Sequence, residues 1–130
     1  KSIYANSVIL ENGVEGAGTI MVNYGNMQGE LLYSKITNSK LPSQIQGEKG
    51  CMIIKEIPDT REITIIYNNG KEEHININKY DNNMYYEVEE LIRLIQTKEN
   101  ADVYNKCSLM ELSIMDEARR KMGIKFPADV

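Results

Sequence analysis

Apolar and polar residues alternate with a period of two through the first two-thirds of the chain, which is the pattern of β-strands. Asn12-Gly13 and Asn69-Gly70 predict hairpin turns, because Asn and Gly tolerate the positive φ angles of a type I′ turn. Weaker turn signals lie at Gly25-Asn26 and at residues 47–50. These turns delimit about six or seven antiparallel strands, at residues 3–10, 19–24, 30–37, 43–46, 51–57, 62–67 and 73–77.

The apolar period changes to three and four in the last third, as on one face of an α-helix. A first helix is predicted from Met84 to Lys98, capped by one of Asp81, Asn82 and Asn83. A second is predicted from a capping box at Ser108 and Glu111 to a stop at Gly123. Strands followed by helices favour an α+β fold, with a mostly antiparallel, open-faced sheet of about six strands and the two helices packed on one face.

Both faces of this sheet are predicted to be apolar. One strand phase carries Ile20, Val22, Leu31, Tyr33, Ile53, Ile63 and Ile65, and the other carries Met21, Leu32, Ile36, Met52, Ile54 and Ile66. Two helices can cover only one side of a single-layer sheet, and a large uncovered apolar face usually marks an interface. We therefore expect a homo-oligomer in which the uncovered face meets a second subunit.

Length and composition fit one globular domain over residues 1–130, because 42% of the residues are apolar and 26% are charged. The net charge of −4 argues against a nucleic-acid partner. The longest apolar run, Cys51 to Ile54, is too short to cross a membrane, and a cytoplasmic protein is expected. A chain that opens on Lys1 and runs at once into a strand has the look of a piece of a longer protein.

The two cysteines, Cys51 and Cys107, have no second Cys or His at metal-ligand spacing. Inert buried thiols in a reducing compartment are the favoured interpretation, with one disulfide as the alternative. Gly13, Gly16 and Gly18 fall in a hairpin and not between a strand and a helix, so they do not predict a dinucleotide loop.

Side chains at three further places could carry chemistry but favour structural explanations. The acidic cluster Glu87, Glu89 and Glu90 fits a solvated helix face, with Glu89 paired to Arg93 at the i,i+4 spacing. Tyr85 and Tyr86 fit core or interface positions. His74, the sole histidine, is expected at the surface or edge of a hairpin strand, without a catalytic partner.

Lys35 is the one candidate substrate-binding residue. It is predicted inside a strand, on the phase shared by Leu31 and Tyr33, where an inward ammonium could contact a substrate or an acidic group. The alternative is a lysine that reaches past the sheet edge to solvent. No residue of the chain is predicted to be catalytic, to bind a cofactor or to hold a metal ion.

Several stretches carry recognisable local patterns: GTIMVNYG (18–25), YSKITNS (33–39), PSQIQGEKG (42–50), MYYEVEELI (84–92), IMDEARR (114–120) and GIKFP (123–127). Together they resemble the C-terminal region of the glucose-fructose oxidoreductase and inositol dehydrogenase family (Gfo/Idh/MocA). The resemblance implies a two-domain parent protein with an N-terminal Rossmann domain that binds NAD or NADP. It also implies a C-terminal open sheet that shapes the pocket for a sugar, polyol or related small molecule and mediates oligomers.

The family's catalytic and nucleotide-binding motifs have no counterpart among these residues. The chain lacks a Gly-x-Gly-x-x-Gly motif, a Glu-Lys-Pro stretch and the family's Asp and His pair, so no catalytic residue is carried over. We therefore expect a domain that is inactive alone and holds no cofactor. The alternatives are a free-standing dimerisation or small-ligand binding module, and a small enzyme centred on His74 and Lys35.

Overall fold

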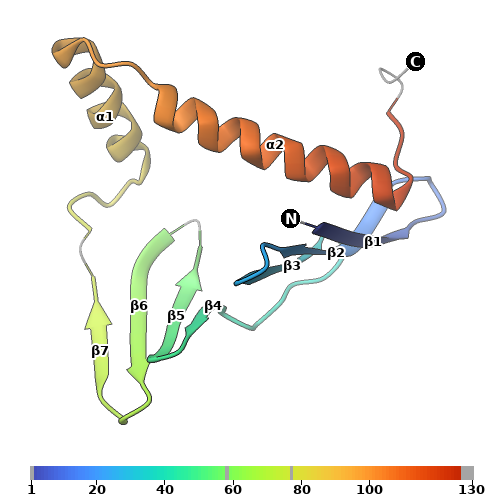
Figure 1. Cartoon of the computed structure of the whole chain (residues 1–130), viewed down its shortest axis with the longest axis horizontal. Coiled ribbons are helices and arrows are strands. Elements are labelled where there is room, and N and C mark those ends of the chain that lie inside the picture. The colour runs from blue at the N-terminus through green and yellow to red at the C-terminus, as the bar shows by residue number, and fades with distance from the viewer. Residues whose placement is uncertain (1, 58, 77, 127–130) are drawn as a thin grey trace. The chain divides into compact units, whose positions relative to one another are not determined.

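The computed structural model of the chain describes residues 2–57, 59–76 and 78–126 (Figure 1). In these residues seven strands precede two helices: β1 (Ser2–Ile9), β2 (Glu15–Asn23), β3 (Gln28–Ser34), β4 (Ser43–Gly47), β5 (Gly50–Glu56), β6 (Asp59–Tyr67), β7 (Glu72–Ile75), α1 (Met84–Thr97) and α2 (Asp102–Met122). Each predicted strand corresponds to an observed one. The end of the last predicted strand, Ile77, lies outside the described residues.

The hairpin turns use the glycines that the sequence indicated. Gly13 and Gly70 adopt φ angles of 81° and 83°, and Gly25 adopts 95°, a region that residues with a Cβ rarely enter. Each glycine follows an asparagine or lies beside one, and Asn12, Asn23 and Asn69 accept backbone N–H bonds two residues ahead. The local turn chemistry therefore sets where the strands end.

The strands form two antiparallel sheets, of order β1-β2-β3 and β4-β5-β6-β7. The α+β class is confirmed, with the strands divided between two sheets instead of gathered in one. The division falls between β3 and β4, where residues 35–42 form an irregular connection that includes Pro42 and is too long for a tight hairpin. The chain accordingly forms two compact units: unit 1 is Lys1–Ser39 with Ala101–Val130, and unit 2 is Lys40–Asn100.

Unit 1 buries its core between α2 and the first two strands. Ile3 and Val22 are register partners on β1 and β2, and both pack with Ala118, which is fully buried. The small Ala118 side chain permits a close approach of α2 to β1, and four partly buried residues surround this core: Ala5, Ile20, Ile114 and Met122. As predicted, Ile20, Val22, Leu31 and Tyr33 share the helix-covered face, and Met21 and Leu32 lie on the opposite one.

The start of α2 differs from the prediction. The helix begins at Asp102, so Ser108 lies inside it and caps nothing. No Gly or Pro interrupts residues 102–122, and the acid in the first turn favours the positive end of the helix dipole. The predicted end is confirmed: Gly123 is left-handed, and Gly123 and Ile124 donate to the carbonyls of Arg120 and Arg119.

In unit 2 the register of the sheet corrects the predicted faces. Met52 pairs with Ile65, and Ile54 pairs with Ile63, so these four side chains share a face, while Ile53 and Ile66 lie on the other. The prediction had grouped Ile53 with Ile63 and Ile65. It failed because the β5–β6 register joins odd-numbered to even-numbered residues, and a one-residue change of register moves every side chain to the opposite face.

The first helix begins at the predicted residue and ends at Thr97, one residue before the predicted end. α1 begins at Met84, whose N–H donates to Asn82 Oδ1 at 2.9 Å, and Lys98 follows it in the left-handed conformation. Its apolar stripe is exposed, because Leu91 and Ile95 keep 57% and 68% of their surface. Whereas α2 packs on strands, α1 therefore presents this stripe to solvent within its own unit.

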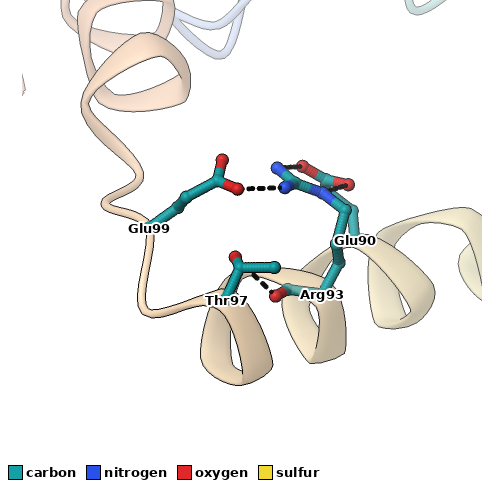
Figure 2. Close-up of polar contacts among 4 residues, drawn as sticks. All are labelled: Glu90, Arg93, Thr97 and Glu99. Atoms are coloured by element: carbon teal, nitrogen blue, oxygen red, sulfur yellow. Dashed lines mark hydrogen bonds and ion pairs between the residues drawn. The ribbon is translucent and has the colours of Figure 1, made fainter.

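Arg93 holds the end of α1 in place (Figure 2). Its guanidinium donates to both carboxylate oxygens of Glu90, at 2.8 and 2.9 Å, and to Glu99 at 2.8 Å, while Thr97 Oγ1 donates to the Arg93 carbonyl. These bonds raise the pKa of Arg93 and lower that of Glu99. The predicted Glu89–Arg93 pair is wrong, because Glu89 pairs with Lys79 at 2.8 Å instead.

The two cysteines are free and differ in burial. Cys51 is half-buried in β5, whereas Cys107 is exposed on α2. The prediction of a buried Cys107 is wrong. The sequence placed Cys107 just before the second helix, whereas α2 begins at Asp102 and holds Cys107 on its solvent-exposed side.

Candidate functional site

A groove of about 600 Å³ runs along the helix-covered face of unit 1, and we call it the α2 groove. Its floor is the sheet face beside and beneath α2, with Ile20, Val22, Leu31 and Tyr33, and α2 forms one wall with Leu112, Met115 and Met122. Ile124 and Phe126 close one side after the helix ends. The volume and the apolar lining are in the range of protein binding sites.

Tyr33 lies where the groove meets the end of α2. Its hydroxyl contacts Met122 Sδ at 3.5 Å, and its ring occupies space left by Gly18, where a Cβ would come within 2.6 Å of the Tyr33 hydroxyl. Partial burial raises the pKa of Tyr33, and the nearby Glu15 carboxylate adds to the rise. The hydroxyl therefore stays protonated at neutral pH and can donate a hydrogen bond.

Lys35 follows the last residue of β3 and so lies just past the strand, not inside it as predicted. Its N–H still donates to the Gly16 carbonyl at 2.7 Å, which continues the sheet by one bond. The ammonium pairs with Glu15 Oε1 at 3.0 Å, with 55% of the Lys35 side chain exposed and 22% of the Glu15 side chain exposed. Lys35 is thus paired with a carboxylate of the chain itself, that of Glu15. A contact between Lys35 and a substrate stays a prediction.

The rim of the α2 groove is charged. Arg119 lies 3.8 Å from Asp116 and stacks over the Phe126 ring at 4.9 Å. Glu111 lines the same wall, about two turns before Arg119. Apolar contact, tyrosine hydroxyls and charged groups at the margin suit the binding of a partner surface or ligand. They do not form a nucleophile with its general base.

The other residues that the sequence singled out lie in structural settings. His74 is exposed in β7, with Nδ1 3.1 Å from Thr64 Oγ1 on the neighbouring strand, as expected of a surface histidine. Gly16 and Gly18 lie within β2, and Gly13 lies in the preceding turn. None of these three glycines opens a helix.

Tyr85 and Tyr86 organise the segment before α1. Tyr80 stacks on Tyr85 at 5.3 Å and meets Tyr86 edge-on at 5.2 Å, and the Tyr86 hydroxyl accepts the N–H groups of Lys79 and Tyr80. Glu89 receives hydrogen bonds from Lys79 and from the Tyr80 hydroxyl, which lower its pKa. Two members of the acidic cluster, Glu89 and Glu90, are thus held in ion pairs on a solvated helix face.

Neither a metal site nor a membrane span is found in the described part of the chain. Residues 2–57, 59–76 and 78–126 contain no group of three or more His, Cys, Asp or Glu side chains placed to hold a metal ion. Within the same residues, neither helix combines the length and the apolar character needed to cross a bilayer.

Sequence reasoning found part of the groove and missed its closing contacts. Alternation placed Leu31 and Tyr33 on one face, but no local signal pairs Tyr33 with Met122, which is 89 residues away. The Lys35–Glu15 pair could have been anticipated from the hairpin, because the two residues lie at adjoining ends of neighbouring strands.

Comparison with known proteins gives relatives along almost the whole chain. It is 38% identical over 131 residues to the scyllo-inositol 2-dehydrogenase (NADP(+)) IolU of Bacillus subtilis (strain 168), and 28% identical over 129 residues to the uncharacterized oxidoreductase YgjR of Escherichia coli (strain K12). Each match covers 99% of the chain but only 40% and 39% of these two proteins. No protein-family model matches.

The long motifs quoted above all lie inside these matches, which leave almost no part of the chain uncovered. The comparisons therefore support the resemblance of these motifs to the C-terminal region of the glucose-fructose oxidoreductase and inositol dehydrogenase family (Gfo/Idh/MocA), and the chain spans about two-fifths of the length of the two oxidoreductases.

Proposed function

We propose that the chain is the C-terminal substrate and oligomerisation domain, over residues 1–130, of a cytoplasmic NAD(P)-dependent oxidoreductase that acts on a sugar, a polyol or a related small molecule. The observation that carries the proposal is a match along 99% of the chain to two-fifths of a protein named as an NADP(+)-dependent inositol dehydrogenase. The remaining three-fifths of such a protein would supply the N-terminal Rossmann domain, the cofactor site and the catalytic groups.

The chemistry of the chain agrees with a supporting role. The α2 groove offers apolar walls and a protonated Tyr33 hydroxyl, and the described residues hold no cluster of metal-ligating side chains. Such groups can bind and orient, whereas hydride transfer needs the nicotinamide. The isolated domain is therefore inactive in this proposal.

The test compares the 130-residue chain with the full-length protein that contains it. Oxidation of scyllo-inositol is followed by the absorbance of the reduced nicotinamide, with NADP⁺ and NAD⁺ in parallel and other polyols as further substrates. The full-length protein is expected to turn over at least one polyol, and the 130-residue chain none. Turnover by the 130-residue chain alone, or by neither protein on any polyol or sugar, would contradict the proposal.

The oligomer contact in this proposal is the sheet face of unit 1 that α2 leaves open. Tyr4 and Met21 are register partners there, and Leu32 lies on the same face with 79% of its surface exposed. Leu32→Glu places a charge in that contact, while Leu31→Glu places the same charge on the opposite face of the same strand. Light scattering should show dissociation for the first variant only, and an unchanged mass for Leu32→Glu would rule out this face.

A further inference from the structure

The chain contains two Asn-Gly dipeptides, Asn12-Gly13 and Asn69-Gly70, and each lies at the tip of a hairpin, between β1 and β2 or between β6 and β7. In each turn the glycine N–H donates at 2.9 Å to the carbonyl three residues earlier, that of Leu10 or of Tyr67. In each turn the asparagine Oδ1 accepts the N–H two residues ahead, at 3.1 and 3.0 Å. The two tips are therefore a matched pair in dipeptide sequence and in internal hydrogen bonding.

An asparagine followed by glycine can react with its own backbone. The nitrogen of the glycine attacks Cγ of the asparagine, the bond from Cγ to the side-chain nitrogen breaks, and ammonia leaves with the proton that the attacking nitrogen gives up. The product is a five-membered succinimide ring, which water opens at either carbonyl to give aspartate or isoaspartate. Glycine obstructs the attack least, because it has no Cβ.

The tip that holds Asn69 is tied to a neighbouring turn. Asn68 donates its N–H to the Lys49 carbonyl at 3.0 Å and its Nδ2 to the Glu48 carbonyl at 2.8 Å. Both acceptors lie in the turn between β4 and β5, so the β6–β7 tip is held from outside its own hairpin.

The tip that holds Asn12 is held only by its own hairpin in the part of the chain that the structure describes. There the hydrogen bonds of residues 11–14 stay between β1 and β2, and the ladder has a register shift close by, at the end of β1. Residues 11–14 and 68–71 are all exposed, so access of water does not distinguish the two tips. The two bonds of Asn68 do.

We propose that Asn12 is the preferred site of spontaneous deamidation in the folded protein, and that the bonds of Asn68 protect Asn69 from the same reaction. Attack requires the asparagine side chain and the glycine nitrogen to leave their turn hydrogen bonds, so its rate follows local opening of the tip. Opening the β6–β7 tip also breaks the bonds of Asn68, which slows the reaction at Asn69 about tenfold or more. The inference goes beyond the proposed function and does not rest on it.

The modification changes the hairpin that carries it. Either product adds a negative charge at residue 12, next to the carboxylate of Glu11. Isoaspartate also lengthens the main chain by one carbon, directly before Gly13, whose φ of 81° sets the turn.

The test incubates the full-length protein at mildly alkaline pH, which favours loss of the proton from the attacking nitrogen. Peptide mapping by mass spectrometry follows the conversion of amide to carboxylate at Asn12 and at Asn69. Asn12 is expected to convert about tenfold faster or more. In the urea-unfolded protein the two rates should converge, because the hydrogen bonds of both tips are then lost.

Asn68→Ala removes the side-chain bond to Glu48 and should raise the rate at Asn69 by about three- to tenfold. Glu11→Ala changes the equivalent position of the other hairpin and, as the matched control, should leave the rate at Asn69 unchanged. Equal rates at the two sites of the folded wild type would overturn the inference. So would an Asn69 rate that Asn68→Ala does not raise, or a ratio of rates that is the same in the folded and the unfolded protein.

Discussion

Two glycines of the three-stranded sheet differ in what a methyl group would meet. A Cβ at Gly18 would lie 2.6 Å from the Asn6 carbonyl oxygen and from the Tyr33 hydroxyl, whereas a Cβ at Gly29 would meet nothing within 4 Å. Gly18 is therefore required by a close approach of side chain and backbone, and Gly29 is not. The contrast tests the close approach of Asn6 and Tyr33 to β2 at Gly18.

Gly18→Ala is expected to destabilise the chain by about 1–3 kcal/mol, because Tyr33 must leave its place and lose contact with Met122. Chemical denaturation at neutral pH measures the free energy of unfolding. The matched control Gly29→Ala should change it by less than about 0.5 kcal/mol. A similar cost for both variants would mean that Tyr33 does not depend on the space at Gly18.

Substitution of Lys35 can distinguish a role in substrate binding from a role in the stability of the fold. Its ion pair with Glu15 is exposed on the lysine side, so Lys35→Met should change the free energy of unfolding by less than about 1 kcal/mol. If Lys35 contacts substrate in the full-length protein, the same change raises KM about tenfold or more, with Glu15→Gln as the control that keeps the ammonium. An unchanged KM for Lys35→Met would leave Lys35 as a solvated partner of Glu15.

At the scale of elements, local signals predicted the ends of strands and helices wherever glycine or asparagine fixes the backbone. Gly13, Gly70 and Gly123 are the clearest cases, since each adopts the left-handed conformation that its turn or helix end requires. The start of α2 was missed because Ser108 and Glu111 resemble a cap while residues 102–107 can continue a helix backwards. A capping pattern marks a start only where the preceding residues cannot be helical.

The end of α1 is predicted to weaken in acid. The pKa of Glu99 is lowered chiefly by its hydrogen bond to Arg93, so its stabilisation is fully present above the unfolded value of about 4.3 and is lost as the pH falls below it. The Cα chemical shifts of Leu94–Lys98 should move toward coil values between about pH 5 and pH 3. Arg93→Gln should show smaller helical shifts at neutral pH and little further change in acid.

A control for this titration is Glu87→Gln, which removes a carboxylate from the same helix without touching Arg93. That variant should keep the acid transition of the wild type at Leu94–Lys98. A transition that survives Arg93→Gln unchanged would show that other carboxylates govern the helix end.

Tyr86 is predicted to hold the segment before α1 through its hydroxyl oxygen. That oxygen accepts the N–H groups of Lys79 and Tyr80, at 2.5 and 3.2 Å, so Tyr86→Phe leaves both without these bonds. Hydrogen exchange of the two amides should accelerate about tenfold. Tyr85→Phe keeps the ring stacking and should leave both rates unchanged. Equal rates in the wild type and both variants would mean that the Tyr86 hydroxyl does not hold this segment.

At the scale of the whole molecule, the sequence predicted the α+β class and the family resemblance but not the division into two sheets. Alternation identifies which residues share a face within one strand, as for Leu31 and Tyr33, and it does not identify the register between strands. That is why Ile53 was assigned to the wrong face. The oligomer face stays a prediction, since it concerns a partner that a single chain does not contain.

The central claim is that this domain works beside a cofactor-binding domain and holds no nicotinamide itself. Titration calorimetry with NADPH measures this directly in the 130-residue chain and in the full-length protein. The account predicts saturable binding at one site per subunit in the full-length protein and no binding heat in the chain alone. Saturable binding of NADPH to the 130-residue chain would contradict it.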